Sequence, residues 1–391
     1  SLYDNVLMMK FLERHGSTHP LVGLCMGEHG IISRILAVRA GSAFTFASAM
    51  AGEETAPGQI AASVLRSVYR IEQVDAATRV YGVAGNPVAQ SLSPRMMNAA
   101  FRRENVNAVF VALWAKELDD LLLCVQEIPV HGASITMPYK QALMPHLDNS
   151  DVPSQKIGAC NTLVRAADGK LYGFNTDMAG VVAAIEQRVT LPGLKVLVIG
   201  AGGAARAAVF GLRQRGAEVF ILNRTPAKAQ KLARQAQAKT IKRADLKKLL
   251  LDVIINATPL GMGGNPQSPL NQPEIKARYV MDMVYRPLET RFLQLARAAG
   301  AQVIPGMDMF VHQGARQFEI WTGKPAPLAE MQNEVTSALE AESRPANGRD
   351  GKNGSGAAAA HNGSAAHANG SRRPAAKAAK PVKHAKAKAR R

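Results

Sequence analysis

Lys140 and Asp177 are the residues of this sequence best suited to acid–base chemistry, and each lies in a short polar segment that follows an apolar run. The two segments read SITMPYK and GFNTD. Reduction of a ketone by hydride requires a proton at the developing alkoxide, and a lysine beside a carboxylate can supply it by relay and electrostatic stabilisation. The pattern favours a catalytic pair, although Lys140 alone could be a solvated helix charge and Asp177 a capping residue.

Two further polar segments, NPVAQSLSPRMMN and GACNT, supply groups that could bind a small hydroxylated acid. The hydroxyls of Ser91 and Ser93 could bind a carboxylate, and Thr136 and Asn161 could bind sugar-like hydroxyls. Each segment also has a structural explanation. Ser93-Pro94 is an ordinary helix start with serine as the N-cap, and Asn161 could be a turn residue. The sequence shows no cluster with metal-ligand spacing, so we expect no metal here.

The segment VLVIGAGGAARAAV has the G-x-G-x-x-A pattern of a dinucleotide-binding turn. Gly200 permits a tight turn, Gly202 lets the backbone approach a pyrophosphate, and Ala205 allows close packing of the following helix, whose free N–H groups would face the phosphates. An apolar strand before the turn, a helix after it and a strand ending about 20 residues later favour a dinucleotide over a structural glycine turn. The expected contacts are Gly200, Ala201, Gly202, Gly203 and Ala204.

The next strand ends in Asn223-Arg224-Thr225 rather than in the Asp or Glu that would bind a ribose 2′-hydroxyl. A guanidinium and a hydroxyl suit a 2′-phosphate, so the sequence favours NADP over NAD. Lys228, one helical turn further on, could contact the same phosphate. The alternative is that Arg224 and Lys228 are solvated surface charges.

The elements that must position these residues alternate as in α/β proteins. The first stretch, about 80–190, has apolar strands and a hairpin that turns at Asp168-Gly169. From about 193 to 305, strands and helices follow the order of a doubly wound sheet, and a helix-rich stretch extends from about 307 to 342. The expected strands are 80–85, 108–114, 131–137, 194–199, 218–223, 252–257, 279–284 and 301–304, with the hairpin over 161–174.

The N-terminal segment, residues 1–75, also alternates as β/α units do. After a helix-like start, we expect apolar strands at 20–27 and 43–49 and helices at 30–40 and 57–73. Two strands cannot close a barrel, so the expectation is a partial (β/α) barrel fragment.

The net charge of +18 is concentrated at the end of the chain. Residues 343–391 hold twelve Lys or Arg residues and one Asp, so eleven of the eighteen net charges lie there. This tail has no aromatic residue and almost no large aliphatic one, and we expect it to be disordered. It could bind nucleic acid or another polyanion, or serve only as a solubilising extension.

Cysteine usage and hydropathy indicate the compartment. Cys25, Cys124 and Cys160 have no metal or redox spacing, which favours a reducing environment without disulfides. The sequence has no apolar run long enough for a bilayer and no signal peptide pattern, so we expect a cytoplasmic protein. A start at Ser1 rather than Met suggests a fragment or a processed product.

From about residue 80 to 342 the sequence resembles the shikimate dehydrogenase family. The motifs GNPVAQSLSPRMMN, SITMPYK, GACNTLV, GFNTD, GAGGAARAA, NRT, INATPLGM, DMVYRPLETRFL and GMDMFVHQGARQFEIWTG occur in the family's order and spacing. The resemblance implies a substrate-binding domain at 79–190, a Rossmann NADP-binding domain at 191–305 and helices at 306–342 that pack back on the substrate domain. One departure is Met97, where the family usually has a histidine, which affects the expected pocket wall.

The resemblance also implies roles for single residues. Ser91 and Ser93 would bind the substrate carboxylate, and Lys140 would be the general acid/base. The expected hydroxyl contacts are Thr136, Asn161, Asp177 and Gln313. Substrate and nicotinamide are expected to meet at Tyr285 and Gly306, and Met283 is expected to contact the cofactor.

Residues 1 to about 73 resemble the last part of type I 3-dehydroquinate dehydratase, a (β/α)8 barrel family, through MGEHGIISR, GSAFTFA and TAPGQ. This resemblance implies that Arg34, Thr55 and Gln59 belong to a substrate loop. The Schiff-base lysine and the proton-shuttling histidine of that family would precede Ser1. Lys10 is expected to be a surface charge rather than a nucleophile.

Three hypotheses follow from these observations. The first is an NADP-dependent shikimate dehydrogenase of the shikimate pathway, joined to an incomplete dehydratase segment. The second is a bifunctional dehydratase and shikimate dehydrogenase in a longer chain, and the third is a polyanion-binding protein with a catalytically idle Rossmann body. The choice between shikimate and quinate as substrate stays open, since pocket geometry decides one ring hydroxyl.

Overall fold

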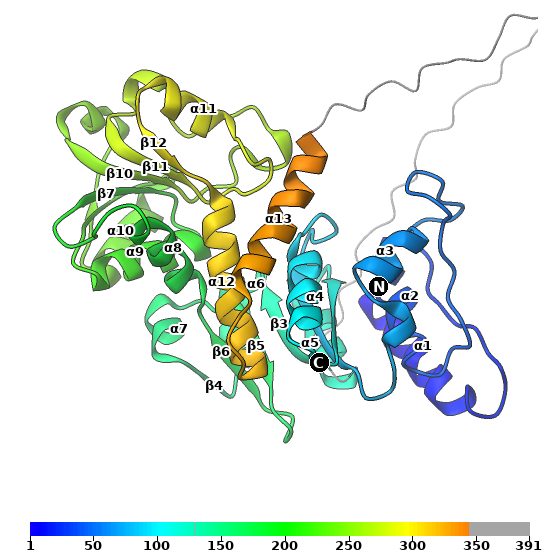
Figure 1. Ribbon diagram of the computed structural model, residues 1–391. Coiled ribbons are helices and arrows are strands. Elements are labelled where there is room, and N and C mark those ends of the chain that lie inside the picture. Colours follow the sequence, from blue (N-terminus) through cyan, green and yellow to red (C-terminus); the bar gives the residue numbers. More distant parts are fainter. Residues whose placement is uncertain (129, 344–391) are drawn as a thin grey trace, which may run out of the picture. The chain divides into compact units, whose positions relative to one another are not determined.

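The computed structural model describes residues 1–128 and 130–343, which belong to one compact unit, Ser1–Pro345. This unit contains two six-stranded sheets with helices packed against them (Figure 1). The chain from residue 344 onward, including its expected disorder, lies outside the described residues.

The first sheet has the strand order β2-β1-β3-β5-β6-β4. Its first three strands are parallel, and β5 and β6 form the expected antiparallel hairpin, whose turn places Gly169 at φ +85°. The strands are β1 (Arg79–Gly85), β2 (Ala108–Trp114), β3 (Val130–Ile135), β4 (Asn149–Ser150), β5 (Thr162–Arg165) and β6 (Leu171–Phe174). The helices of this part are α4 (Ser93–Arg103), α5 (Leu118–Glu127), α6 (Tyr139–Ala142), α7 (Val152–Ile157) and α8 (Asp177–Glu186).

The second sheet is parallel throughout, with the strand order β12-β11-β10-β7-β8-β9. The order reverses beside β7, the first strand, which confirms the doubly wound arrangement. The strands are β7 (Lys195–Ile199), β8 (Glu218–Leu222), β9 (Lys239–Thr240), β10 (Leu251–Asn256), β11 (Ala277–Asp282) and β12 (Gln302–Ile304). The helices are α9 (Gly203–Gln214), α10 (Pro226–Ala236) and α11 (Arg291–Ala298).

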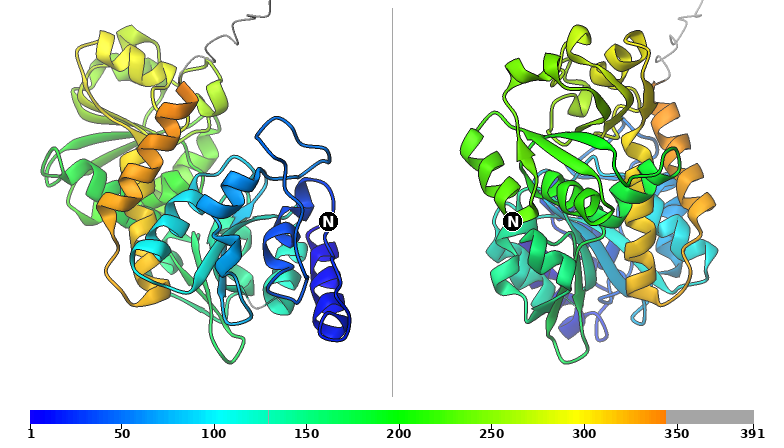
Figure 2. Two further views of the ribbon diagram at one scale, coloured as in Figure 1. Left: turned by 45° about the vertical axis from the view of Figure 1, so that its right-hand side comes forward. Right: turned by 90° about the vertical axis from the view of Figure 1, so that its left-hand side faces the viewer.

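Two long C-terminal helices, α12 (Gly306–Thr322) and α13 (Leu328–Ser343), return to the first sheet, where they lie beside α4 (Figures 1 and 2). Phe318 and Trp321 of α12 share a buried cluster with Tyr81 and Phe110 of the first sheet. Because strand residues alternate between faces, Val109 and Val111 of β2 lie in a different cluster from Phe110. The first sheet therefore has two apolar faces, and the C-terminal helices cover one of them.

The expected strands at 20–27 and 43–49 are wrong. Within the described residues, these segments make only single backbone hydrogen bonds to other segments, such as Ala43 N–H to Leu21 O at 2.7 Å, and one isolated bridge between Ser48 and Ala61. A strand needs a partner along its length, and no neighbouring strand lies beside either segment here. The helix-like start is confirmed by α1 (Leu2–His15). The helices expected at 30–40 and 57–73 are shorter, α2 (Ile31–Leu36) and α3 (Ala62–Ser67), with 3₁₀ turns at Glu28–Gly30 and Ile71–Gln73.

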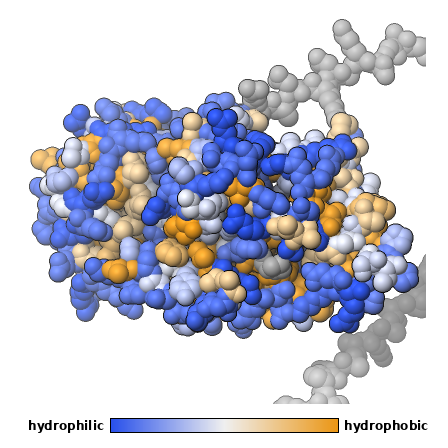
Figure 3. Space-filling model, turned by 60° about the horizontal axis from the view of Figure 1, so that its bottom comes forward, coloured by the Kyte–Doolittle hydropathy of each residue, from blue (hydrophilic) through white to orange (hydrophobic). Residues whose placement is uncertain are grey.

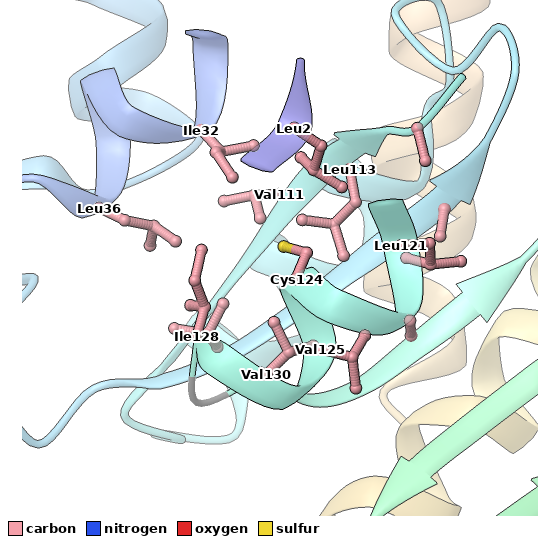
Figure 4. Packing of buried hydrophobic residues seen from close by; sticks show 14 of the residues in the cluster. Leu2, Ile32, Leu36, Val111, Leu113, Leu121, Cys124, Val125, Ile128 and Val130 are labelled. Atoms are coloured by element: carbon pink, nitrogen blue, oxygen red, sulfur yellow. The ribbon is translucent and has the colours of Figure 1, made fainter. Parts of the chain in front are cut away.

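The N-terminal helices cover the other face of the first sheet. Leu2 and Leu12 of α1 and Leu36 of α2 belong to one buried cluster with Val111 of β2 and Cys124 of α5. Figure 4 shows these helices meeting the strand and α5 around that cluster. The N-terminal segment and the first sheet therefore share a single hydrophobic core.

The surface is mostly hydrophilic on the face drawn in Figure 3, with apolar groups in small patches. Among the described helices, none combines the length and the apolar composition that crossing a bilayer requires.

The shared core predicts that a cavity in α1 destabilises the first sheet. Leu12 is fully buried, so Leu12→Ala should lower the free energy of unfolding by about 2–5 kcal/mol. Leu7, on the same helix and 50% exposed, provides the matched control Leu7→Ala, which should cost far less. Urea unfolding followed by tryptophan fluorescence measures this, because both tryptophans, Trp114 and Trp321, lie outside the N-terminal segment. An unchanged tryptophan transition in Leu12→Ala would show that the segment unfolds independently.

Candidate active site

The candidate site lies where the carboxyl ends of strands from the two sheets approach each other. Lys140, on α6 after β3, lies beside Gly203, the first residue of α9 after β7. A Cβ atom added to Gly203 would come within 3.3 Å of both Cβ and Cδ of Lys140. The glycine-rich turn and the lysine that the sequence suggested as an acid are thus in direct contact.

Lys140 forms an ion pair with Asp177, the first residue of α8. The side chains are only 16% and 5% exposed, so Lys140 is not a solvated helix charge. The other oxygen of Asp177, Oδ1, accepts a hydrogen bond of 2.8 Å from Asn161 Nδ2. Asp177 is thereby oriented from two sides, and one of its oxygens faces the ammonium group.

Asn161 is a buried hub and not an exposed turn residue. Its Nδ2 also donates to Gln313 Oε1 at 3.2 Å and to Thr176 Oγ1 at 2.9 Å, while its Oδ1 accepts from the Thr176 amide at 2.7 Å. Gln317, one helical turn after Gln313 on α12, donates to the Asn161 carbonyl at 3.0 Å. This network joins the hairpin, the start of α8 and α12 into one polar wall.

The serine-containing loop after β1 lies near Tyr285 of the loop after β11. The side chains of Tyr285 and Ser91 are hydrogen-bonded, and burial raises the pKa of Tyr285. Tyr285 also stacks on Phe310 of α12, with ring centroids 4.2 Å apart. Ser93 is the first residue of α4 and not its N-cap, since the cap position is Leu92, and the Ser93 amide donates to Ser91 Oγ at 3.2 Å.

Thr136 and Met97 differ in their relation to this site. Thr136 follows β3, and its hydroxyl makes no hydrogen bond within the described residues, so it is available to a ligand. Its Cγ2 lies 2.4 Å from the position of a Cβ added to Gly85, which limits that position to glycine. Met97, the departure from the family pattern, is fully buried in the cluster that contains Phe101 and Phe318.

The glycine-rich turn has the geometry that its sequence predicted. Gly200 adopts φ +128°, and a Cβ there would approach Ala257 O to 2.8 Å. A Cβ added to Gly202 would meet nothing within 4 Å, so this backbone is open to a ligand. Ala205 is fully buried in the packing of α9. The turn and the N-terminus of α9 thus offer N–H groups to an anion such as a pyrophosphate.

At the end of β8, the side chains of Arg224 and Lys228 are exposed and make no hydrogen bond or ion pair among the described residues. Thr225 is the N-cap residue of α10, and its carbonyl accepts from Asn223 Nδ2 at 2.9 Å. These free cations fit either a phosphate ligand or solvent.

Asp282, at the end of β11, is a site residue that the sequence did not single out. It is fully buried, and it accepts from Thr290 Oγ1 at 2.6 Å, Asn256 Nδ2 at 2.9 Å and the Val284 amide at 3.0 Å. It therefore binds both ends of the loop that carries Tyr285, at Val284 and at Thr290. The sequence signal that could have identified Asp282 is its position at the end of an apolar strand, in YVMDMV.

Met283 and Gly306 both lie next to Asp282, Met283 in the chain and Gly306 at the start of α12. The Met283 amide donates to Asn256 O at 3.0 Å. A Cβ added to Gly306 would come within 2.6 Å of the carbonyl oxygens of Asp282 and Val284, so only glycine allows α12 to begin there.

The dehydratase-like residues form a separate group near the N-terminus. Thr55 donates from both its amide and its hydroxyl to Gln59 Oε1, at 2.8 and 3.2 Å. Arg34 is buried beneath this loop and donates to Pro57 O at 3.4 Å, and burial lowers the pKa of its guanidinium. Lys10 is 52% exposed and pairs with Glu127 of α5, which is the expected surface role.

The doubly wound sheet, the glycine turn and the adjacent buried lysine–carboxylate pair define a dinucleotide-dependent dehydrogenase class. Family models narrow this class. The shikimate dehydrogenase substrate binding domain matches residues 83–163, the shikimate/quinate 5-dehydrogenase model matches 183–261, and the shikimate 5'-dehydrogenase C-terminal domain matches 306–336. The type I 3-dehydroquinase model matches residues 1–76.

Individual proteins agree with these models. The shikimate dehydrogenase (NADP(+)) of Syntrophobacter fumaroxidans is 39% identical over 68% of this chain and 96% of its own length. The crystal structure of shikimate 5-dehydrogenase from Thermus thermophilus in complex with NADP(H) and shikimate has a TM-score of 0.63 at 36% identity, covering 67% of this chain and 100% of that one. This chain belongs to the shikimate dehydrogenase family.

A chloroplastic bifunctional 3-dehydroquinate dehydratase/shikimate dehydrogenase from Arabidopsis thaliana is 37% identical over 79% of this chain. The chain spans 54% of the length of that relative, so about half of the relative has no counterpart here.

Asp282 predicts an unusual pH dependence of stability. Burial raises its pKa from 3.8 to about 6. The folded protein then binds more protons than the unfolded chain between about pH 4 and 6, and this carboxyl lowers the free energy of unfolding as the pH rises through that range. Asp282→Asn keeps an uncharged oxygen that can accept from Asn256 and from the Val284 amide, and its NH2 group can donate to the Thr290 hydroxyl, so the third hydrogen bond reverses direction. It should stabilise the protein at pH 8 by up to about 3 kcal/mol, and by about 1.4 kcal/mol less at pH 5.

Urea unfolding of the parent and Asp282→Asn at several pH values between 5 and 8 measures this difference. Parallel curves would contradict an ionisation of Asp282 in this range.

Proposed function

We propose that this chain catalyses the reversible NADPH-dependent reduction of 3-dehydroshikimate to shikimate, a step of the shikimate pathway. The contact between Gly203 of the glycine-rich turn and Lys140 of the buried ion pair carries the proposal, because the proposed proton donor then lies beside the proposed pyrophosphate turn. The identity of 39% to a shikimate dehydrogenase (NADP(+)) over nearly its full length supports the choice of substrate and cofactor.

The described residues fit NADP. The turn at Gly200 to Ala204 would hold the pyrophosphate, and Asn223, Arg224, Thr225 and Lys228 would hold the 2′-phosphate end. Met283 and Gly306 would lie at the nicotinamide. The cofactor, when bound, supplies or accepts the hydride. The side chains of Arg224 and Lys228 have no other partner within the described residues, which supports their role as phosphate ligands.

Lys140 would move the proton. Its ammonium group donates a proton to the carbonyl oxygen that becomes the hydroxyl, and it takes that proton back in the reverse direction. Asp177 holds the ammonium in place and stabilises its charge in a site with little water. Asn161 fixes Asp177 through its second oxygen.

The remaining polar groups would orient the substrate. Ser91, Ser93 and Tyr285 would bind its carboxylate, and Thr136 with Gln313 would bind ring hydroxyls. The hydrogen bond between Tyr285 and Ser91 supports a shared carboxylate site, and the free hydroxyl of Thr136 supports its role as a ligand group. A comparison of kcat/KM for shikimate and quinate would test the alternative of a quinate/shikimate dehydrogenase.

We propose the corresponding domain organisation: residues 79–190 bind the substrate, residues 191–305 bind NADP, and residues 306–342 pack back on the substrate-binding domain. The core shared by α12 and α13 with the first sheet supports this division. Cytoplasmic localisation is a further proposal, supported by three cysteines that form no disulfide. Contact of the basic tail with a polyanion also stays a prediction, since the tail lies outside the described residues.

A bifunctional protein is the alternative, suggested by the Arabidopsis relative and by the dehydroquinase match at residues 1–76. Within that match Lys10 is the only lysine, and it is exposed and paired with Glu127. Residues 1–76 therefore offer no lysine suited to a Schiff base for dehydration. The gene sequence upstream of Ser1 discriminates between the two hypotheses.

Loss of the proton donor should affect turnover rather than binding. Lys140→Ala should reduce kcat for shikimate oxidation by about 10²-fold or more and leave KM little changed. Lys170→Ala removes an exposed lysine that also pairs with an aspartate, Asp168, and should keep the parent rate. A spectrophotometric assay with shikimate and NADP measures both variants. Parental turnover by a folded Lys140→Ala would refute the mechanism.

Loss of the free guanidinium at the end of β8 should change cofactor preference. Arg224→Ala should raise KM for NADP by roughly tenfold or more, since a charge-assisted hydrogen bond to phosphate is worth about 1.5–3 kcal/mol, and should leave KM for NAD nearly unchanged. Arg234→Ala, an exposed arginine further along α10, is the control. Equal losses with NADP and NAD would show that Arg224 does not contact the 2′-phosphate.

A further inference from the structure

The interface between the N-terminal segment and the first sheet contains a chain of contacts that reaches the serine loop of the proposed site, residues 86–92. It begins at His29, in the 3₁₀ turn Glu28–Gly30, whose ring lies against Trp114 at the end of β2. The ring centroids are 4.8 Å apart, and His29 Nδ1 lies 3.0 Å from the Trp114 carbonyl oxygen. Because a carbonyl only accepts, Nδ1 must carry the proton in this contact.

His29 is held in place from within its own segment. The buried side chain of Asn5 on α1 donates to the His29 carbonyl at 2.9 Å. Two residues earlier, the Gly27 amide donates to Pro57 O at 2.9 Å. The histidine is therefore tied both to α1 and to the dehydratase-like loop at 55–59.

Trp114 passes the contact on to the serine loop. Its indole N–H donates to Asn86 Oδ1 at 2.9 Å. Asn86 is the first residue after β1, and its amide donates to Met137 O at 2.9 Å, so the start of this loop is fixed on two sides. Five residues later, Ser91 meets Tyr285.

The next residue of the chain reaches the proposed acid. The carbonyl of Ala115 accepts a buried hydrogen bond of 3.0 Å from the hydroxyl of Tyr139. Tyr139 directly precedes Lys140 on α6. The end of β2 thus touches both the loop that would bind the carboxylate and the helix that carries Lys140.

We infer that His29 and Trp114 are positioning residues for the shikimate site: the N-terminal segment holds the end of β2, and the end of β2 holds the loop at 86–92. The inference rests on the proposed function for its kinetic consequence, but not for its structural one. The segment then contributes to substrate binding by the dehydrogenase even though it supplies no dehydratase chemistry.

Kinetics of the full chain test this inference. His29→Ala removes the ring and its donor, and Trp114→Phe keeps an aromatic ring but loses the N–H to Asn86. Each should raise KM for shikimate about three- to tenfold, the range expected for one hydrogen bond, with kcat and KM for NADP within about twofold of the parent. His29→Asn keeps a donor near the Nδ1 position and should rescue KM. The double variant should lose less than the product of the two single effects, because both act through one path.

Lys10→Ala is the matched control. It breaks the ion pair between Lys10 and Glu127, which joins α1 to α5 in the same interface without reaching the serine loop. It should leave KM for shikimate unchanged. A parental KM in both His29→Ala and Trp114→Phe, or an equal rise in Lys10→Ala, would overturn the inference.

Amide hydrogen exchange gives a readout that does not require activity. In His29→Ala the segment 86–92 should exchange faster than in the parent, whereas the hairpin at 162–174 should not change. Unchanged exchange at 86–92, or an increase spread over the whole first sheet, would overturn the positioning role. If exchange at 86–92 is faster in His29→Ala than in the parent, but the parent does not oxidise shikimate, the proposed function is refuted and the positioning inference still holds.

Discussion

The ion pair of Lys140 and Asp177 is the constraint on which the rest of the site depends. Two charges that are nearly excluded from water lose hydration, and their attraction compensates only when their remaining hydrogen-bonding groups are satisfied. Asn161 meets this requirement by donating to the second oxygen of Asp177. Lys140 lies on α6, which follows β3, and Asp177 is the first residue of α8, which follows β6. The ion pair therefore joins two segments that leave the first sheet from different strands.

The same requirement explains why α12 must return to the first sheet. Asn161 is buried and polar. Its backbone carbonyl accepts from Gln317, and its side-chain Nδ2 donates to Gln313, one turn earlier on α12. Gln317 also accepts from Ser134 of β3 at 2.7 Å. A helix that began elsewhere would leave these groups unpaired at a cost of about 1–3 kcal/mol each. The close approach of Gly306 to the Asp282 and Val284 carbonyls sets that starting point.

Much of this arrangement was predictable because it depends on local rules. The apolar strands, the Asp168-Gly169 turn and the glycine-rich turn follow from alternation, positive φ and a helix N-terminus, all of which are written in short stretches. The grouping of Lys140 with Asp177 and Asn161 came from the resemblance and from strand ends, and the geometry agrees with it. Their catalytic and binding roles stay predictions. Other features depend on which segments meet in space, which short patterns do not specify. Asp282 looks like an ordinary residue after a strand, and only the structure brings hydrogen-bond donors from two other segments to its oxygens.

The segments 20–27 and 43–49 have the apolar composition of strands, but the structure gives them no neighbouring strand with which to pair. The same difference between helices and strands explains how the N-terminal segment can pack against the first sheet. An α-helix satisfies its backbone groups internally, whereas a strand depends on a neighbour. Residues 1–75 accordingly form α1, α2 and α3 but no strand, and α1 and α2 present Leu2, Leu12 and Leu36 to the apolar face formed by β2 and α5. Without such a cover, Val111 and its neighbours would form an exposed apolar patch. A segment that resembles part of one enzyme thus completes the core of another, and its helices rather than its strands make that possible.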